Sequence, residues 1–314
     1  MVRYENRFGS GSQGVVQSVK GKGTMRLSFW THASVFACAS LLLSPGSEIF
    51  SQMVPAYEVY AVSYGRAEES IPLSSVAVGA DPNQTLQINC MFWFLKGSDG
   101  RNILVDTGFL RDSPHFLSYP LTIIDYVRPD SALARLGIQP EDVTDIVLTH
   151  LHWDHADGIS LFPTAKVWIQ RAEFEYYTGD AWQAEEEPSG VDVRDIIQLV
   201  EVNTQGRLRF IGGDGQKIYE GITAYTGPKH TYSSQYLGVE TGGETVVLAS
   251  DNLVAYEAFG LPFPPSLSLD PPADLRAHQR MRTIASSIDL IIPGHDTAVF
   301  DRFPNPFEWV ARIR

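Results

Sequence analysis

Histidine and aspartate side chains recur in four short patches of this chain, and their spacing constrains the fold more than any other feature. The first patch has the form His-x-His-x-Asp-His and directly follows an apolar run at residues 146–148 that is typical of a buried strand. Each later patch also follows a strand-like run or a turn signal. A strand that stops at such a patch delivers its side chains to one edge of a sheet. The candidate metal ligands are His150, His152, Asp154, His155, His230, Asp251 and His295.

Imidazole and carboxylate are the ligands that zinc accepts when no thiolate is present. The seven donors are enough to hold two divalent ions around one bridging water. We expect zinc, with iron, manganese or cobalt as alternatives, because geometry and availability decide between these ions more than raw affinity does. Water bound to zinc has its pKa lowered from about 16 to about 7, so hydroxide is available near neutral pH. The patches therefore predict a metal-dependent hydrolase.

The alternative is that these are ordinary core or surface histidines. That interpretation is the better one for any single histidine, but it does not account for five of the eight histidines falling in such contexts. It is kept for His32, His115 and His278. His278 lies in a stretch, residues 273–280, that is typical of a solvated helix face.

In kind and order, the candidate ligands resemble those of the metallo-β-lactamase superfamily, and the resemblance covers roughly residues 55 to 314. Residues 103–108 and 140–145 are similar to segments of that family as well. The resemblance implies an α/β fold, an αββα sandwich in which two mixed β-sheets are flanked by helices. Within the superfamily the chain is most similar to the N-acyl-homoserine lactonase branch. That branch implies an enzyme that opens lactone rings and so quenches quorum sensing.

The resemblance also implies how the ligands are shared. Asp251 would bridge two metal ions, one held by His150, His152 and His230 and the other by Asp154, His155 and His295.

Two side chains are candidates for catalysis beside the ions. Asp154 is expected to carry a proton to the leaving oxygen. Lactonases of this branch have a tyrosine three residues after the bridging aspartate, where this chain has Val254. Tyr256 is the candidate replacement, although another group can serve. Asp106 and Asp157 are expected to orient ligand imidazoles, and for Asp157 a capping role in a turn is favoured.

Other activities stay open at this point. Hydrolysis of other esters or of phosphoesters needs the same ligands. A β-lactamase-like enzyme is a further alternative, although an aspartate at position 251 counts against it. A non-hydrolytic di-iron protein would have glutamate in place of His152, and a purely structural metal site is the remaining option.

Composition bears on partners. The formal net charge of -13 argues against nucleic acid, because phosphates favour basic surfaces. The two cysteines, Cys38 and Cys90, cannot form a disulfide framework. Long aromatic loops at residues 109–128 and 256–272 are expected to wall a pocket for a small lactone or ester. The same residue types would suit a homodimer contact.

Residues 1–53 are expected to be a leader and residues 54–314 the hydrolase domain. A short basic start, an apolar middle and a small-residue exit predict a signal peptide within residues 25–50. The apolar span is too short and interrupted to predict stable membrane insertion. We therefore expect a periplasmic or secreted enzyme, with an unprocessed leader on a cytoplasmic enzyme as the alternative.

The remaining pattern predicts individual elements. Strands are expected at residues 91–95, 103–105 and 165–169, and helices at residues 130–136, 171–177 and 191–202. Asp130 is expected to cap the first of these helices and Gly137 to end it.

Overall fold

A computed structural model describes residues 56–183, 188–227, 229–264 and 266–314. The expected leader at residues 1–53, with its signal peptide, lies outside the described residues. Within the described ranges, no helix is long and apolar enough to cross a membrane.

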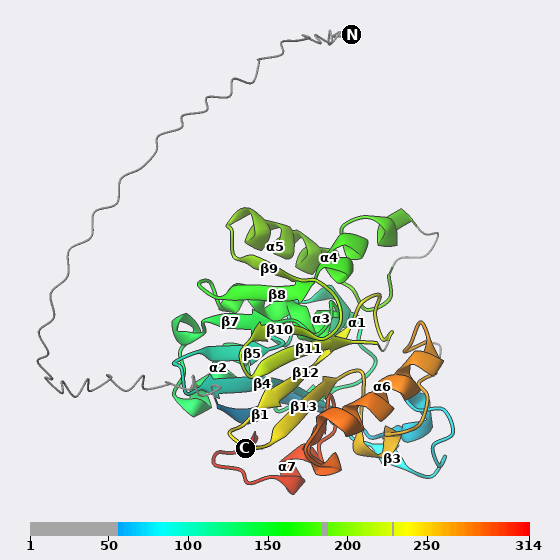
Figure 1. Cartoon of the computed structure of the whole chain (residues 1–314). Helices are drawn as coiled ribbons and strands as arrows, with labels where there is room; N and C mark the ends of the chain where they lie inside the picture. Colours follow the sequence, from blue (N-terminus) through cyan, green and yellow to red (C-terminus); the bar gives the residue numbers. More distant parts are fainter. Residues whose placement is uncertain (1–55, 184–187, 228, 265) are drawn as a thin grey trace, which may run out of the picture. The chain divides into compact units, whose positions relative to one another are not determined.

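Two β-sheets form the centre of the described structure (Figure 1). The larger sheet has the order β15 (Val310–Arg312), β1 (Tyr57–Ala67), β4 (Asn89–Gly97), β5 (Asn102–Val105), β7 (Asp145–Val147), β8 (Lys166–Gln170) and β9 (Leu208–Ile211), and β6 (Ile123–Ile124) pairs with β1. The second sheet has the order β10 (Gln216–Tyr219), β11 (Ile222–Thr226), β12 (Gln235–Glu240), β13 (Thr245–Ser250) and β14 (Ile291–Pro293). A small pair is formed by β2 (Ile71–Pro72) and β3 (Thr85–Leu86).

Both of the large sheets are mixed. In the larger sheet, β4 pairs antiparallel with β1 and β5, whereas β5, β7, β8 and β9 run parallel to one another. In the second sheet, β13 and β14 are parallel and the other pairs are antiparallel.

Strand β4 shows why the sheets stack. Successive side chains of a strand point to opposite faces, and nearly every residue of β4 is buried. Trp93 packs into the layer between the two sheets, together with side chains from β11, β12 and β13. Phe92 and Phe94 instead join the cluster on the other face, beneath the helices.

Helices cover the outer faces. They are α1 (Pro114–Ser118), α2 (Pro129–Leu133), α3 (Trp153–Ala156), α4 (Arg171–Tyr177), α5 (Val193–Thr204), α6 (Pro271–Ile284) and α7 (Val299–Arg302). In Figure 1, α4 and α5 lie by the larger sheet and α6 by the second sheet. Two of the longest helices have side-chain N-caps, Asp192 on α5 and Asp270 on α6. The αββα sandwich and its α/β class are confirmed.

The three expected strands and the helix at residues 171–177 are confirmed. The helix expected at residues 130–136 begins instead at Pro129, so Asp130 lies in its first turn and pairs with Arg128. Its last residues form a 3-10 helix, and Gly137 ends it with a φ of 73°. The helix expected at residues 191–202 begins later, at Val193, because Asp192 caps it.

The expectation of a solvated face for His278 is wrong. His278 is 1% exposed. Its Nε2 donates to the Asn252 carbonyl at 2.7 Å, and its Nδ1 accepts the Gly260 N–H at 3.2 Å. Both ring nitrogens are therefore occupied within the core, which is consistent with its exclusion from the ligand set.

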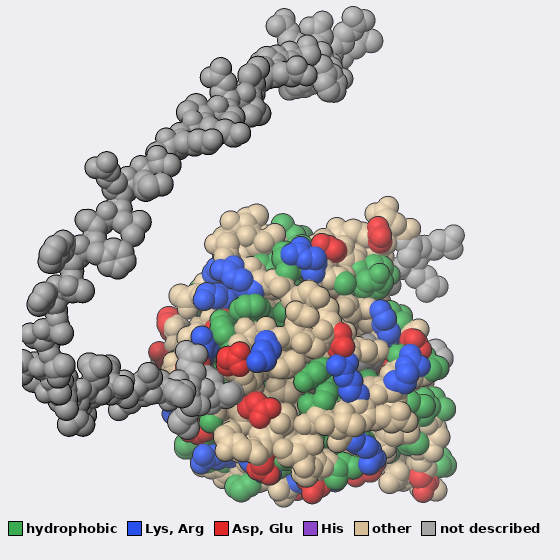
Figure 2. Space-filling view, viewed as in Figure 1, with side chains coloured by type: hydrophobic (Ala, Val, Ile, Leu, Met, Phe, Trp, Pro, Cys, Tyr) green, Lys and Arg blue, Asp and Glu red, His purple; other side chains and the backbone are tan. Residues whose placement is uncertain are grey.

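On the face drawn in Figure 2, acidic and basic side chains are interspersed among apolar ones. The described residues that are coloured there form no continuous basic surface on that face.

Candidate metal centre

The candidate ligands stand on segments that leave the two sheets at a common edge. His150 and His152 follow β7, and His155 lies one turn further on α3. Asp251 directly follows β13, and His295 follows β14. Because β13 and β14 are parallel, their ends deliver Asp251 and His295 side by side.

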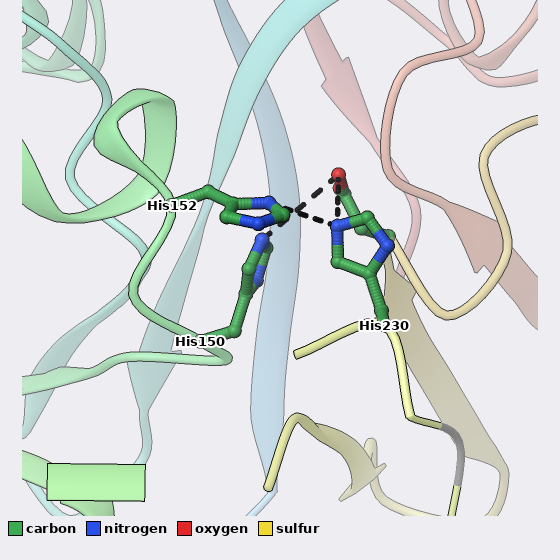
Figure 3. Close-up of side chains that lie close together, drawn as sticks. His150, His152 and His230 are labelled. Atoms are coloured by element: carbon green, nitrogen blue, oxygen red, sulfur yellow. Dashed lines mark hydrogen bonds and ion pairs between the residues drawn. The ribbon is translucent and has the colours of Figure 1, made fainter. Parts of the chain in front are cut away.

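The seven donors gather into two groups, and within each group the donor atoms lie within 4.8 Å of one another. The first group is His150, His152, His230 and Asp251, and the second is Asp154, His155 and His295. Figure 3 shows the three imidazoles of the first group turned toward one another. Nδ1 of His152 lies 2.9 Å from Nε2 of His230. This is the division that the family resemblance implied.

The Asp251 carboxylate faces both groups. Its Oδ2 lies 3.3 Å from Nε2 of His230 in the first group. Its Oδ1 lies 2.9 Å from Nε2 of His295 and 3.3 Å from Nε2 of His155 in the second group. One oxygen is thus presented to each group, which is the arrangement of a bridging carboxylate.

Four of the ligand imidazoles contact an oxygen behind them through Nδ1. The pairs are His150 with the Thr149 hydroxyl at 2.9 Å, His155 with the Asp106 carboxylate at 2.8 Å, His230 with the Leu267 carbonyl at 2.8 Å and His295 with the Asn89 carbonyl at 2.9 Å. Each contact leaves Nε2 directed at the cluster, which is how metal-binding histidines are usually held. Asp106 thus contacts a ligand imidazole, as its expected orienting role requires. Asp157 instead accepts a hydrogen bond from the Leu110 backbone N–H.

Two of the inward nitrogens show that the cluster suits a cation. Among the described residues, Nε2 of His150 and Nε2 of His155 are buried without a hydrogen-bond partner. An unpartnered buried polar atom costs free energy, and a coordinated metal ion would remove that cost. The donors therefore fit divalent metal binding.

The pKa values of the histidines also differ between the two donor groups. Burial, aided by neighbouring imidazoles, lowers the pKa of His150 and of His152 well below the ordinary value. Burial opposes protonation of His295 too, but Asp251 outweighs it and raises that pKa to about 9. Burial opposes the charge on Asp251, yet His295 and His155 hold its pKa well below the usual range.

Asp154 lies at the mouth of the second group. Its Oδ2 is 3.6 Å from Nε2 of both His155 and His295, and it also lines the cavity above the cluster. The Tyr64 hydroxyl donates to the Asp154 backbone carbonyl at 2.9 Å and so fixes this segment. The Asp154 side chain is 19% exposed, so its carboxylate reaches solvent as well as the cluster.

Tyr256 does not lie where the sequence prediction put it. It lines a separate, smaller hollow, and its ring packs under the Arg302 guanidinium at 3.6 Å. Its N–H donates to Asp296 at 3.0 Å. Val254 lines the cavity above the cluster instead. The chain turns into a 3-10 helix at Tyr256, and this turn carries the ring away from the donors.

The cavity above the cluster has a volume of about 410 Å³. Tyr119 and Trp153 form part of its wall and meet edge to face at 5.4 Å. Both long loops contribute as expected, through Tyr119 and through residues 266–269. The sequence prediction missed the wall formed by Tyr176, Tyr177 and residues 188–190. Among the described lining residues, the ordinarily ionised side chains are Asp154 and Asp251, with no lysine or arginine.

A glycine permits the close packing behind Asp251. A Cβ on Gly294 would lie 2.7 Å from Oδ1 of Asp251 and 2.7 Å from the Ser250 carbonyl carbon. Ser250 itself has a φ of 51°, an uncommon conformation for a residue with a side chain. The backbone is therefore shaped locally so that the Asp251 carboxylate reaches both groups.

Comparison with known proteins agrees with this geometry. The profile of the metallo-beta-lactamase superfamily matches residues 85–299. An N-acyl homoserine lactonase of Bacillus cereus is 30% identical over 201 residues, 61% of this chain and 73% of that protein. The N-acyl homoserine lactonase AttM of Rhizobium johnstonii is 29% identical over 184 residues, 55% of this chain and 66% of that protein. A mutant of Bacillus thuringiensis AiiA, solved with N-decanoyl-L-homoserine at its active site, has a TM-score of 0.58 and 26% identity over 76% of this chain and 93% of that one.

The fold and the donor cluster define a metal-dependent hydrolase built on an αββα sandwich. The chain belongs to the metallo-β-lactamase superfamily, whose profile covers more than half of it. The relatives also confirm the resemblance to the N-acyl-homoserine lactonase branch.

Proposed function

We propose that this enzyme holds two divalent ions on either side of Asp251, with zinc the ion we expect, and opens the ring of N-acyl-homoserine lactones. The observation that carries the dinuclear proposal is the Asp251 carboxylate, which presents one oxygen to His230 and the other to His295. Quorum quenching would follow from destruction of such signal lactones.

The cavity supports a neutral substrate with an apolar tail. Its described wall contains aromatic and aliphatic side chains, and it has no cationic side chain to pair with a carboxylate or phosphate. The carboxylate of a β-lactam or the charge of a phosphodiester would find no cationic side chain in that wall. An uncharged lactone with an acyl chain needs none, and the relatives are named for such substrates.

The chain's own groups supply the remaining chemistry. Bound ions would activate water and polarise the carbonyl group. Asp154 borders the cavity and the second donor group, which supports a role in passing a proton to the leaving oxygen. Tyr119 is the tyrosine that we propose for the role expected of Tyr256. It lines the same cavity, and burial, aided by the charge of Asp154, raises the pKa of its hydroxyl, so the hydroxyl keeps its proton as a donor must.

One departure favours a second candidate function. Val254 leaves an aliphatic group where lactonases of this branch have a tyrosine. A neutral aryl ester or phosphotriester, which has a better leaving group, depends less on a proton donor at that place. We therefore keep hydrolysis of such esters as the alternative.

A substrate panel tests the proposal. Metal-loaded enzyme would be assayed on short- and long-chain acyl-homoserine lactones, an aryl ester, a phosphotriester and a β-lactam. We expect the highest kcat/KM on a lactone, and little turnover of the anionic β-lactam. Faster hydrolysis of the aryl ester or phosphotriester than of every lactone would establish the alternative instead.

We also propose export of the enzyme, on the signal-peptide pattern at residues 25–50. Cell fractionation and N-terminal sequencing test this. An exported enzyme should appear outside the cytoplasm with its first residue beyond that segment, and full-length protein confined to the cytoplasm would contradict export.

A further inference from the structure

A buried carboxylate outside the ligand set connects two of the ligand-bearing loops. Glu173 lies on α4 and is 0% exposed. Its Oε1 accepts the Leu151 N–H at 3.3 Å and the Thr231 hydroxyl at 2.6 Å, and its Oε2 accepts the Ser233 N–H at 2.5 Å. Burial of a carboxylate is costly unless hydrogen bonds compensate it, and here three donors do so.

The three donors come from two loops that both serve the first donor group. Leu151 stands between His150 and His152, and Thr231 directly follows His230. One carboxylate therefore ties together the backbones that carry all three imidazoles of that group. The second group has Asp106 behind His155 and the Asn89 carbonyl behind His295. Asp106 also accepts the Thr149 N–H at 2.7 Å, so it supports the residue before His150 as well.

We propose that Glu173 is a positioning residue that sets the metal affinity of the first donor group, acting through the loop backbones and without touching the ion. The inference rests on the proposed dinuclear function. Its physical basis is that ligands held at the right spacing before binding lose less entropy when the ion arrives. Groups that orient ligands from behind typically change metal affinity by about 10- to 100-fold.

Glu173→Gln is the main variant. The amide keeps the size of the side chain but has only one acceptor oxygen, so at least one of the two backbone N–H donors loses its acceptor and faces the amide NH2 group instead. Glu175→Gln is the matched control, because Glu175 lies on the same helix with its side chain 61% exposed and pairs with Arg171 at the surface. Zinc affinities would be measured by competition with a chromophoric chelator.

We expect one of the two ions to bind about 10- to 100-fold more weakly in E173Q, with the other ion and both ions of E175Q within about twofold of wild type. Cobalt-substituted E173Q should also show altered visible bands. Equal weakening of both ions, or no change in either, would overturn the proposal.

Two backgrounds identify which group is affected. With His295→Ala, the first group is left intact, and E173Q should weaken the remaining ion. With His230→Ala, the second group is left intact, and E173Q should have no further effect. The opposite pattern would contradict the assignment.

Thr231→Val keeps the proposal testable if E173Q folds poorly, since it removes a single donor to Glu173 and leaves the carboxylate in place. T231V should weaken binding of the same ion by a smaller factor.

The metal affinities measured in these experiments do not depend on any substrate. A wild-type enzyme that binds metal but hydrolyses no lactone or ester would refute the proposed function, and the Glu173 proposal would still be decided by the chelator titrations.

Discussion

Oδ1 of Asp251 lies 2.9 Å from Nε2 of His295, where the parallel strands β13 and β14 end side by side. The other oxygen of Asp251 faces the first donor group. The carboxylate therefore connects ligands that come from both sheets, and the two donor groups depend on it jointly.

Asp251→Asn should separate the two groups. The amide keeps one oxygen but loses the negative charge that the two proposed cations would share. We therefore expect metal content to fall from about two ions per chain to about one, and kcat/KM to fall by about 100-fold or more. Elemental analysis of the purified variant checks the metal content. Asp289→Asn, which changes an exposed carboxylate, should alter neither quantity.

Gly294→Ala should impair the site through sterics alone. The new methyl group would meet Oδ1 of Asp251 at 2.7 Å and the Ser250 backbone at the same distance, so the carboxylate must move. We expect a loss of metal affinity of about 10-fold or more. Gly212→Ala is the control, because a Cβ there meets nothing within 4 Å. Equal metal affinity in both variants would show that this packing is unimportant.

Tyr119→Phe tests the cavity hydroxyl. If Tyr119 donates to the developing oxyanion or leaving oxygen, kcat should fall by about 10- to 100-fold with little change in KM. Tyr256→Phe removes a hydroxyl from the other hollow and should leave lactone hydrolysis within about twofold of wild type. A larger loss in Y256F than in Y119F would restore the role first expected of Tyr256.

Asp195 gives a prediction for stability. Burial, followed by the charges of Asp157 and Asp192, raises its pKa to about 9, so the folded protein keeps a proton there that the unfolded chain releases near pH 4. Its contribution to stability is present at low pH and is lost as the pH rises toward 9. In chemical unfolding, Asp195→Asn should therefore gain stability relative to wild type between pH 5 and pH 9, by up to about 1.4 kcal/mol per pH unit. A constant difference across that range would contradict the raised pKa.

The ligands could be predicted from the sequence because each stands beside a local signal, a strand end or a turn, and strand ends meet at a sheet edge. The direction in which the Tyr256 side chain projects could not be predicted from the sequence. It depends on the 3-10 turn that starts at that residue and on packing against Arg302. The three-residue spacing between aspartate and tyrosine in the lactonase branch carries no information about such a turn.

Glu173 was missed for a related reason. In the sequence it is one acidic residue in a short helix, indistinguishable from the exposed Glu175 two positions later. Its importance arises from contacts with Leu151 and Thr231, which are far from it along the chain. His278 was misjudged likewise, because the burial of one face of α6 depends on the sheet beneath it.

Titration of metal-free enzyme with zinc tests the central claim most directly, with bound metal and acyl-homoserine lactone hydrolysis followed in the same samples. Two ions sharing Asp251 predict no hydrolysis without metal and full activity at about two equivalents per chain. Undiminished lactone hydrolysis by protein stripped of all metal would contradict the account.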